Sequence, residues 1–125
     1  YPYSMPGLLA CKAAEMQGGM PAHWDMFDRV QWAHAVEARN ITDSAVLRDC
    51  AAEIGLDVAR WEADFASSRA KQAVEADLRE AHQLGVNAVP TLIFNRRWIL
   101  PGAVPESTLR QIVENLLEGK EPTAR

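Results

Sequence analysis

The spacing of apolar residues predicts a series of helices over roughly the first two thirds of the chain. Apolar side chains recur there every three or four residues, which is the period of one face of an α-helix. Glycine, proline and capping residues separate the successive runs. The predicted helices cover about residues 6–17, 21–38, 44–54, 58–66 and 69–84, after an extended lead-in at residues 1–6.

The repeated apolar positions also predict which side chains form the core. Residues three or four apart on a helix share a face, so a stripe of apolar residues is expected to pack inward. The predicted inward-facing residues of the first four helices are Leu9, Ala10, Ala13, Ala14, Met16, Trp24, Phe27, Val30, Val46, Leu47, Cys50, Ala51, Ile54, Val58, Trp61 and Phe65. Trp32 lies off this stripe, and we expect it at a groove or a contact.

The pattern changes after Gly85, where a helical period gives way to a β-type run. Residues 91–95 and 98–100 are predicted strands of a hairpin, and residues 105–118 a last helix. A two-stranded hairpin is only marginally stable alone, and the first strand is apolar on both faces. We therefore expect further strands to pair with it, from a second copy of the chain or from an N-terminal segment. The predicted fold class is mainly α with a small β-hairpin.

The junction between Val89 and Pro90 is a candidate site, because the proline begins the first strand. If the bond is trans, Pro90 simply starts the strand. If it is cis, the backbone polar groups of Val89 face outward and can pair with an extended peptide. The residues alone leave both alternatives open.

Composition and charge exclude several classes of function. The chain has 125 residues and a net charge of -4, and its Lys and Arg residues form no basic stripe for a nucleic acid. No apolar run is long enough to span a membrane. His23, His34 and His82 are not spaced as metal ligands, so neither a metal nor another cofactor is predicted.

Two cysteines, Cys11 and Cys50, are too few for a disulfide framework. Both fall inside predicted helices and are interpreted as structural residues, with a disulfide between them as the alternative. No Cys-x-x-Cys motif occurs in the sequence.

Several short motifs resemble, in their order and spacing, those of the DsbA-like thioredoxin family, in particular its cytoplasmic, polyketide-associated disulfide oxidoreductases. Each motif is weak alone, but together they extend over nearly the whole chain. They are residues 12–18, Glu37 to Ile41, Gly55-Leu56-Asp57, residues 77–80, Gly85-Val86, Val89-Pro90-Thr91 and Pro101-Gly102-Ala103.

This resemblance implies a division of the chain at residue 85. Residues 1–85 would be the helical domain that such proteins insert into a thioredoxin fold, and residues 86–125 the C-terminal half of that fold. It also implies that Val89-Pro90 is the cis-proline loop, so Val89, Pro90 and Thr91 are the predicted substrate-binding residues. The implied substrate is a protein or small-molecule thiol or disulfide, and the implied location is the cytoplasm.

The sequence departs from the family pattern at the redox centre, because the Cys-x-x-Cys motif is absent. No catalytic residue is therefore predicted, and we expect the chain alone to be inactive, with its cysteines in a missing N-terminal segment. One alternative is a glutathione-dependent isomerase or transferase of the same fold, in which a serine replaces the reactive cysteine. Another is a non-catalytic helical module that binds partners or dimerises through the exposed hairpin edge.

Overall fold

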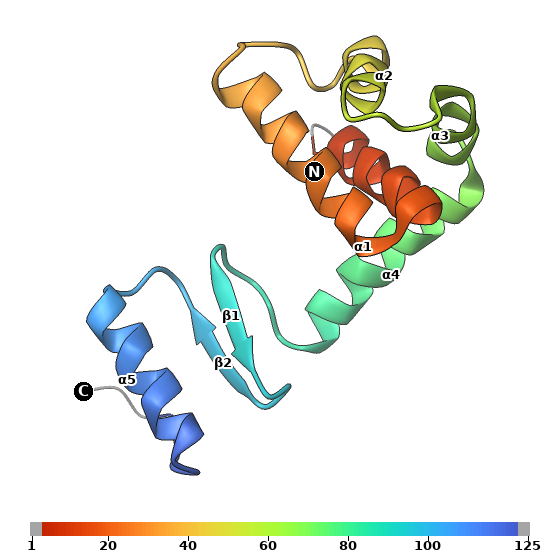
Figure 1. Ribbon diagram of the computed structural model, residues 1–125. Helices are drawn as coiled ribbons and strands as arrows, with labels where there is room; N and C mark the ends of the chain where they lie inside the picture. The colour runs from red at the N-terminus through yellow and green to blue at the C-terminus, as the bar shows by residue number, and fades with distance from the viewer. Residues whose placement is uncertain (1–3, 123–125) are drawn as a thin grey trace. The chain divides into compact units, whose positions relative to one another are not determined.

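The structure is a computed structural model that describes residues 4–122 (Figure 1). The chain divides into two compact units, Tyr1–Leu78 and Arg79–Arg125. This division falls inside the helix Ser68–Gln83. The boundary predicted from the family resemblance lies at residue 85, after the end of that helix. The assignment of two domains stays a prediction. Residues 1–3 of the expected extended lead-in lie outside the described residues. The rest of that prediction is wrong, because the first helix begins at Met5 and not at about residue 6.

The first unit is built from three helices and the beginning of a fourth. They are α1 (Met5–Ala35), α2 (Ser44–Glu53), α3 (Val58–Phe65) and α4 (Ser68–Gln83). The side chains of Asp43 and Asp57 cap α2 and α3 by accepting hydrogen bonds from the backbone N–H groups of Ala45 and Arg60. The sequence predicts Asp57 as the cap of α3 and either Thr42 or Asp43 as the cap of α2, and the structure shows Asp43 in that role.

A break in α1 lets its two halves fold back against each other (Figure 1). Gly19 has a φ of 70° and a ψ of -163°, which a residue with a Cβ rarely adopts. At Gly18, an added Cβ would lie only 2.7 Å from the Cβ of Ala22, so the turn also needs a glycine there. The predicted separation of two helices at Gly18-Gly19 is therefore confirmed.

The core of the first unit lies where α1, α2 and α3 meet, and most of the predicted inward-facing residues are buried or half-buried. Small side chains dominate the contact, which allows the helix backbones to approach closely. The buried cluster is Ala10, Cys11, Ala13, Ala14, Ala22, Met26, Val30, Ala33, Leu47, Cys50, Ala51 and Trp61.

Trp24 and Phe27 are predicted core residues, and this prediction is wrong. Their exposed fractions are 52% and 40%. The second half of α1 buries Ala22, Met26, Val30 and Ala33, so the prediction is confirmed for Val30. Trp24 lies away from this buried stripe, and Phe27 lies at its edge. The sequence misled because apolar residues lie on both faces of this helix, so periodicity alone does not say which face is inward.

Trp61 is the largest fully buried side chain of the described residues. Its indole N–H donates a hydrogen bond of 3.1 Å to the backbone carbonyl oxygen of Ala10, and its ring stacks on Phe65 with centroids 4.8 Å apart. Trp61 therefore joins α3 to the first half of α1 by both burial and a satisfied polar group.

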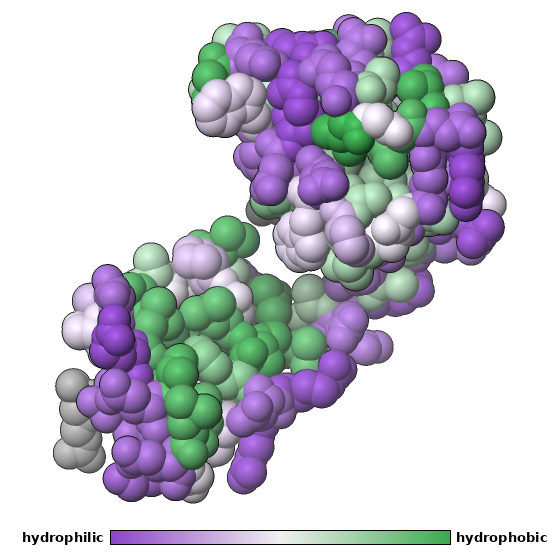
Figure 2. Space-filling model, viewed as in Figure 1, coloured by the Kyte–Doolittle hydropathy of each residue, from purple (hydrophilic) through white to green (hydrophobic). Residues whose placement is uncertain are grey.

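The second unit contains the end of α4, the strands β1 (Thr91–Phe94) and β2 (Trp98–Pro101), and α5 (Glu106–Leu117). The strands pair antiparallel, with Thr91 opposite Pro101 and Phe94 opposite Trp98. The predicted hairpin and last helix are thus present. Figure 2 shows apolar side chains gathered on the surface over these elements, and the exposed ones include Leu92, Ile99, Val113 and Leu117.

The second half of α1 ends at Ala35, three residues before the predicted end at Ala38. Ala38 has a φ of 53°, and the backbone N–H of Arg39 donates to the carbonyl oxygen of Ala33. This is the geometry in which a glycine usually follows a helix. An alanine carries no sequence signal for such an end.

We predict that Ala38→Gly stabilises the protein by about 1 kcal/mol, because it removes the steric cost of a left-handed alanine. Urea unfolding followed by circular dichroism measures the change. Ala35→Gly is the matched control: it lies in the last helical turn and should destabilise by about 0.5–1 kcal/mol. Destabilisation by both substitutions would contradict the left-handed geometry at residue 38.

Trp61→Ala should lower the free energy of unfolding by about 3–5 kcal/mol, because it leaves a cavity in the helical core. Trp61→Phe keeps most of the ring and should cost less. Trp32→Ala is the control, since Trp32 is 58% exposed, and should change stability by no more than about 0.5 kcal/mol. Equal losses for Trp61→Ala and Trp32→Ala would contradict this description of the core.

Candidate functional site

The loop between α4 and β1 contains the three predicted site residues. It starts where α4 ends: Gly85 has a φ of 81°, and the backbone N–H of Val86 donates to the carbonyl oxygen of Ala81. These bonds close the helix in the manner expected of a glycine at this position. The loop therefore leaves α4 in a defined direction.

The other end of the loop is fixed by two short hydrogen bonds. The hydroxyl of Thr91 donates to the carbonyl oxygen of Ala88 at 2.6 Å. The backbone N–H of Gly102 donates to the carbonyl oxygen of Pro90 at 2.7 Å. The peptide bond between Val89 and Pro90 is cis. Both sides of Val89 are thus tied down by neighbouring residues of the same unit.

Val89 itself is the open part of this loop. Its exposed fraction is 95%. Within residues 4–122, neither its backbone N–H nor its carbonyl oxygen has a hydrogen-bond partner. An apolar side chain and two free backbone groups are therefore presented together on a fixed loop.

The two cysteines lie elsewhere, in the helical unit. Both thiols are free and buried. Burial raises the pKa of Cys11 to about 11, with the Glu15 charge adding to the rise and the Lys12 charge opposing it. Burial likewise raises the pKa of Cys50, although Arg29 and Arg39 lie close enough to oppose the rise. A thiol that stays protonated and inaccessible is a poor nucleophile.

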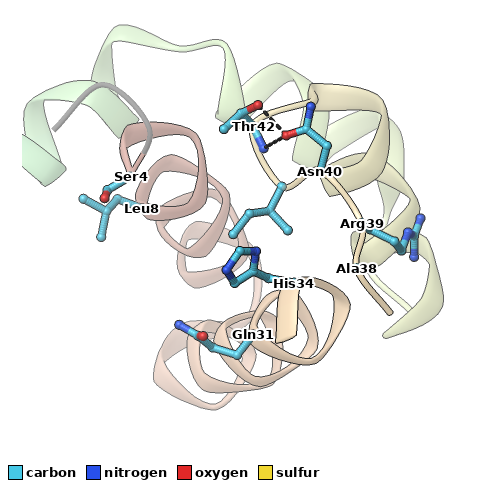
Figure 3. A pocket seen from close by; sticks show the side chains of 9 residues that line it. Ser4, Leu8, Gln31, His34, Ala38, Arg39, Asn40 and Thr42 are labelled. Carbon is cyan, nitrogen blue, oxygen red and sulfur yellow. Dashed lines mark hydrogen bonds between the residues drawn. The ribbon is translucent and has the colours of Figure 1, made fainter. Parts of the chain in front are cut away.

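The helical unit contains a cavity of about 780 Å³ that the sequence did not predict, although His34 and part of the motif Glu37 to Ile41 line it. Figure 3 shows Ser4 and Leu8 from the start of α1, Gln31 and His34 from its last turns, and the loop that follows. The lining residues are Ser4, Leu8, Gln31, His34, Ala38, Arg39, Asn40, Ile41 and Thr42. They contain no acidic side chain and no thiol, so the cavity holds no acid–base pair or nucleophile of the kind that exchange chemistry needs.

An ion-pair network supports the loop beside this cavity. The Arg29 guanidinium donates to Glu37 and Glu53, and Arg39 contacts Glu53 at 3.3 Å. These hydrogen bonds raise the pKa of Arg29 and lower that of the Glu53 carboxyl. The carboxylates therefore hold both arginines, and the Arg39 guanidinium points away from the other labelled cavity residues (Figure 3).

Two further kinds of site are absent from the described residues. Between residues 4 and 122, no group of three or more His, Cys, Asp or Glu side chains is placed to hold a metal ion. In the same range, none of the helices combines the length and apolar character needed to cross a membrane.

Comparison with known proteins places these features in a family. A family model described as thioredoxin matches residues 2–98. The ClpXP adapter protein SpxH is 32% identical in Bacillus subtilis, over 97% of this chain and 42% of that protein. SpxH from Shouchella clausii is also 32% identical, over 87% of this chain and 38% of its own length.

A solved structure gives the same assignment. The cytosolic disulfide reductase DsbM from Pseudomonas aeruginosa, determined with GSH, is 28% identical and matches with a TM-score of 0.66. The match covers 92% of this chain and 59% of DsbM. The chain thus spans about two fifths of the SpxH proteins and under three fifths of DsbM. Because the family match extends over well over half of the chain, the chain belongs to the DsbA-like thioredoxin family.

Proposed function

We propose that this chain is the helical and substrate-docking part of a DsbA-like thiol-disulfide oxidoreductase. In this proposal, the loop Val89-Pro90-Thr91 binds the backbone of a protein or peptide that carries the thiol or disulfide. Family membership supports the class of reaction, and the geometry of the loop supports the role of these three residues.

The observation that carries the proposal is the open backbone of Val89. A free N–H and a free carbonyl oxygen on one residue can pair with an extended peptide as an added strand does. The loop is already fixed by Thr91 and by the Gly102 N–H, so docking needs little further ordering of the protein. The exposed Val89 side chain adds an apolar contact.

The redox step requires groups other than the two cysteines of this chain. In thiol-disulfide exchange, a thiolate attacks one sulfur of a disulfide, forms a mixed disulfide and releases the other sulfur as a thiolate. Cys11 and Cys50 are buried and their pKa values are raised, so neither suits this attack. We therefore assign the exchange to cysteines outside these 125 residues, in keeping with the longer relatives.

The reducing partner and the location follow from the DsbM comparison, as part of the same proposal. DsbM is described as a cytosolic disulfide reductase, and its structure was determined with GSH. We propose glutathione as the small thiol and the cytoplasm as the compartment. The glutathione-dependent isomerase alternative stays a prediction, and a serine in place of the reactive cysteine would favour it. Dimerisation through the hairpin edge also stays a prediction.

A second candidate function is protein binding without redox chemistry. The SpxH relatives are described as ClpXP adapter proteins, and they are 32% identical to this chain. The same open loop would then dock a protein client without exchange. Replacing every cysteine except the buried Cys11 and Cys50 with serine, in the protein expressed from its complete gene, distinguishes the two, because an adapter keeps client binding and an oxidoreductase loses turnover.

We predict that Val89→Asp lowers kcat/KM for glutathione-driven reduction of a disulfide-bonded peptide by about tenfold or more, because docking would desolvate a charge. The enzyme should be the protein expressed from its complete gene. Val36→Asp is the matched control, since Val36 is an apolar residue, 57% exposed, directly after α1 in the helical unit, and should leave kcat/KM unchanged. If the two variants behave alike, Val89 has no docking role.

The two thiols should resist alkylation in the native protein. For a pKa of about 11, the thiolate fraction of Cys11 at pH 8 is well below that of a free cysteine. We expect iodoacetamide to label Cys11 and Cys50 at least about a hundredfold more slowly than the same residues in urea, with the Cys11 rate rising as pH approaches its pKa. Mass spectrometry of digested samples measures both sites. Rapid native labelling at pH 8 would contradict their assignment as inert core residues.

A further inference from the structure

The outward side of the second half of α1 carries large apolar residues that the fold does not use. Met20, Trp24 and Phe27 are spaced four and three residues apart, so they form one row along the helix. Their exposed fractions are 48%, 52% and 40%. We call these three residues the aromatic row. The row lies beside the buried stripe of α1, outside the core, and contiguous exposed apolar side chains of this kind mark interaction surfaces.

The rings of the aromatic row are held in place before any partner arrives. Trp24 meets Phe27 edge to face, with centroids 5.4 Å apart and planes at 80°. Trp24 also meets the His23 ring, with centroids 5.0 Å apart, and His23 Nδ1 lies 3.0 Å from a carboxylate oxygen of Glu15. A partner that packs on these rings therefore loses little of its binding free energy to ordering them.

A second row beside the first is acidic. Asp25 and Asp28 are three residues apart, and Trp32, which is 58% exposed, follows one turn later. In the part of the chain that the structure describes, neither aspartate has an ion-pair or hydrogen-bond partner. The nearest arginine in sequence, Arg29, is occupied by Glu37 and Glu53. The surface is therefore apolar with an uncompensated negative flank.

We propose that this face of α1 binds a basic amphipathic helix of a partner protein, one that carries arginine beside its apolar residues. Its apolar side chains would cover the aromatic row, and its arginines would lie over Asp25 and Asp28. An arginine can also stack on an exposed tryptophan ring, which the face offers in Trp24 and Trp32. The negative flank disfavours anionic lipid and nucleic acid, because their phosphates would be repelled. The proposal does not depend on the redox function.

The length of the face agrees with this occupant. Met20 to Trp32 is thirteen residues, or twelve helical steps of 1.5 Å, which is about 18 Å. A partner helix of three to four turns would cover it, with apolar anchors at helical spacing. Asp25 and Asp28 lie near the middle of this length, so a helix laid beside α1 meets the acidic positions at its centre and apolar positions on both sides of them.

The test uses the protein expressed from its complete gene and two synthetic peptides. One is an 18-residue amphipathic helix of leucine and arginine, and the other has the same leucines with glutamate in place of arginine. Isothermal titration calorimetry should detect binding of the arginine peptide only. Trp24→Ala and Asp28→Arg should each raise its dissociation constant by about tenfold or more. Added salt should weaken binding.

Glu114→Arg on α5 is the matched control, since it reverses one exposed charge elsewhere and should leave the dissociation constant within about twofold. Equal weakening by Glu114→Arg and Asp28→Arg would overturn the proposal, because attraction would then come from net charge alone. Equal binding of the glutamate peptide, or no binding of either peptide, would overturn it as well.

The free protein gives a separate check on whether the face is open. The emission of the wild type minus that of Trp24→Phe gives the fluorescence of Trp24. Quenching of this difference by acrylamide reports how accessible the Trp24 ring is. We expect ready quenching in the free protein and protection with the arginine peptide. A Trp24 already protected in the free protein would mean that another part of the protein or a second copy covers the face, and would overturn the proposal.

Discussion

The helical unit depends on close contact between the two halves of α1 and on the buried side chain of Trp61, which packs against them. Alanines line the contact, and Gly18 leaves no room for a Cβ against Ala22. The indole of Trp61, which belongs to α3, is buried in this core. Its N–H donates a hydrogen bond to the carbonyl oxygen of Ala10 in α1. Dense packing of this kind leaves little freedom for side chains to move. It also explains why Cys11 and Cys50 are structural: both lie in this cluster, where a thiolate would be costly.

The second unit differs from the first, because much of its apolar surface is exposed, including Leu92, Ile99, Val113 and Leu117. The loop before β1 is anchored there by the Thr91 hydroxyl, which bonds Ala88, and by the Gly102 N–H, which bonds Pro90. Val89 stands out from that loop with its backbone groups unpaired among the described residues. The chain therefore combines a dense, chemically inert helical core with a rigid loop whose open groups suit peptide recognition.

Much of this could be predicted from the sequence, because the signals are local. Asp43, Asp57 and Gly85 mark helix ends by their own chemistry, and the apolar stripe of α2 has one interpretation only. The outward position of Trp24 and Phe27 could not be predicted, since α1 has apolar residues on two sides and the choice between them depends on tertiary packing. The cavity beside His34 is lined by residues from the start of α1, from its last turns and from the loop that follows. Tertiary packing brings these segments together, and no local sequence pattern encodes it.

The most direct test of the account is hydrogen–deuterium exchange on the protein expressed from its complete gene, free and trapped as a mixed disulfide with a substrate peptide. A single peptide fragment covering residues 86–91 reports on the loop, because its amides include that of Val89. The account predicts that exchange in this fragment slows when the substrate is trapped, while the buried segments of α1 and α2 keep their rates. Unchanged exchange in residues 86–91, with new protection elsewhere, would contradict substrate docking at Val89.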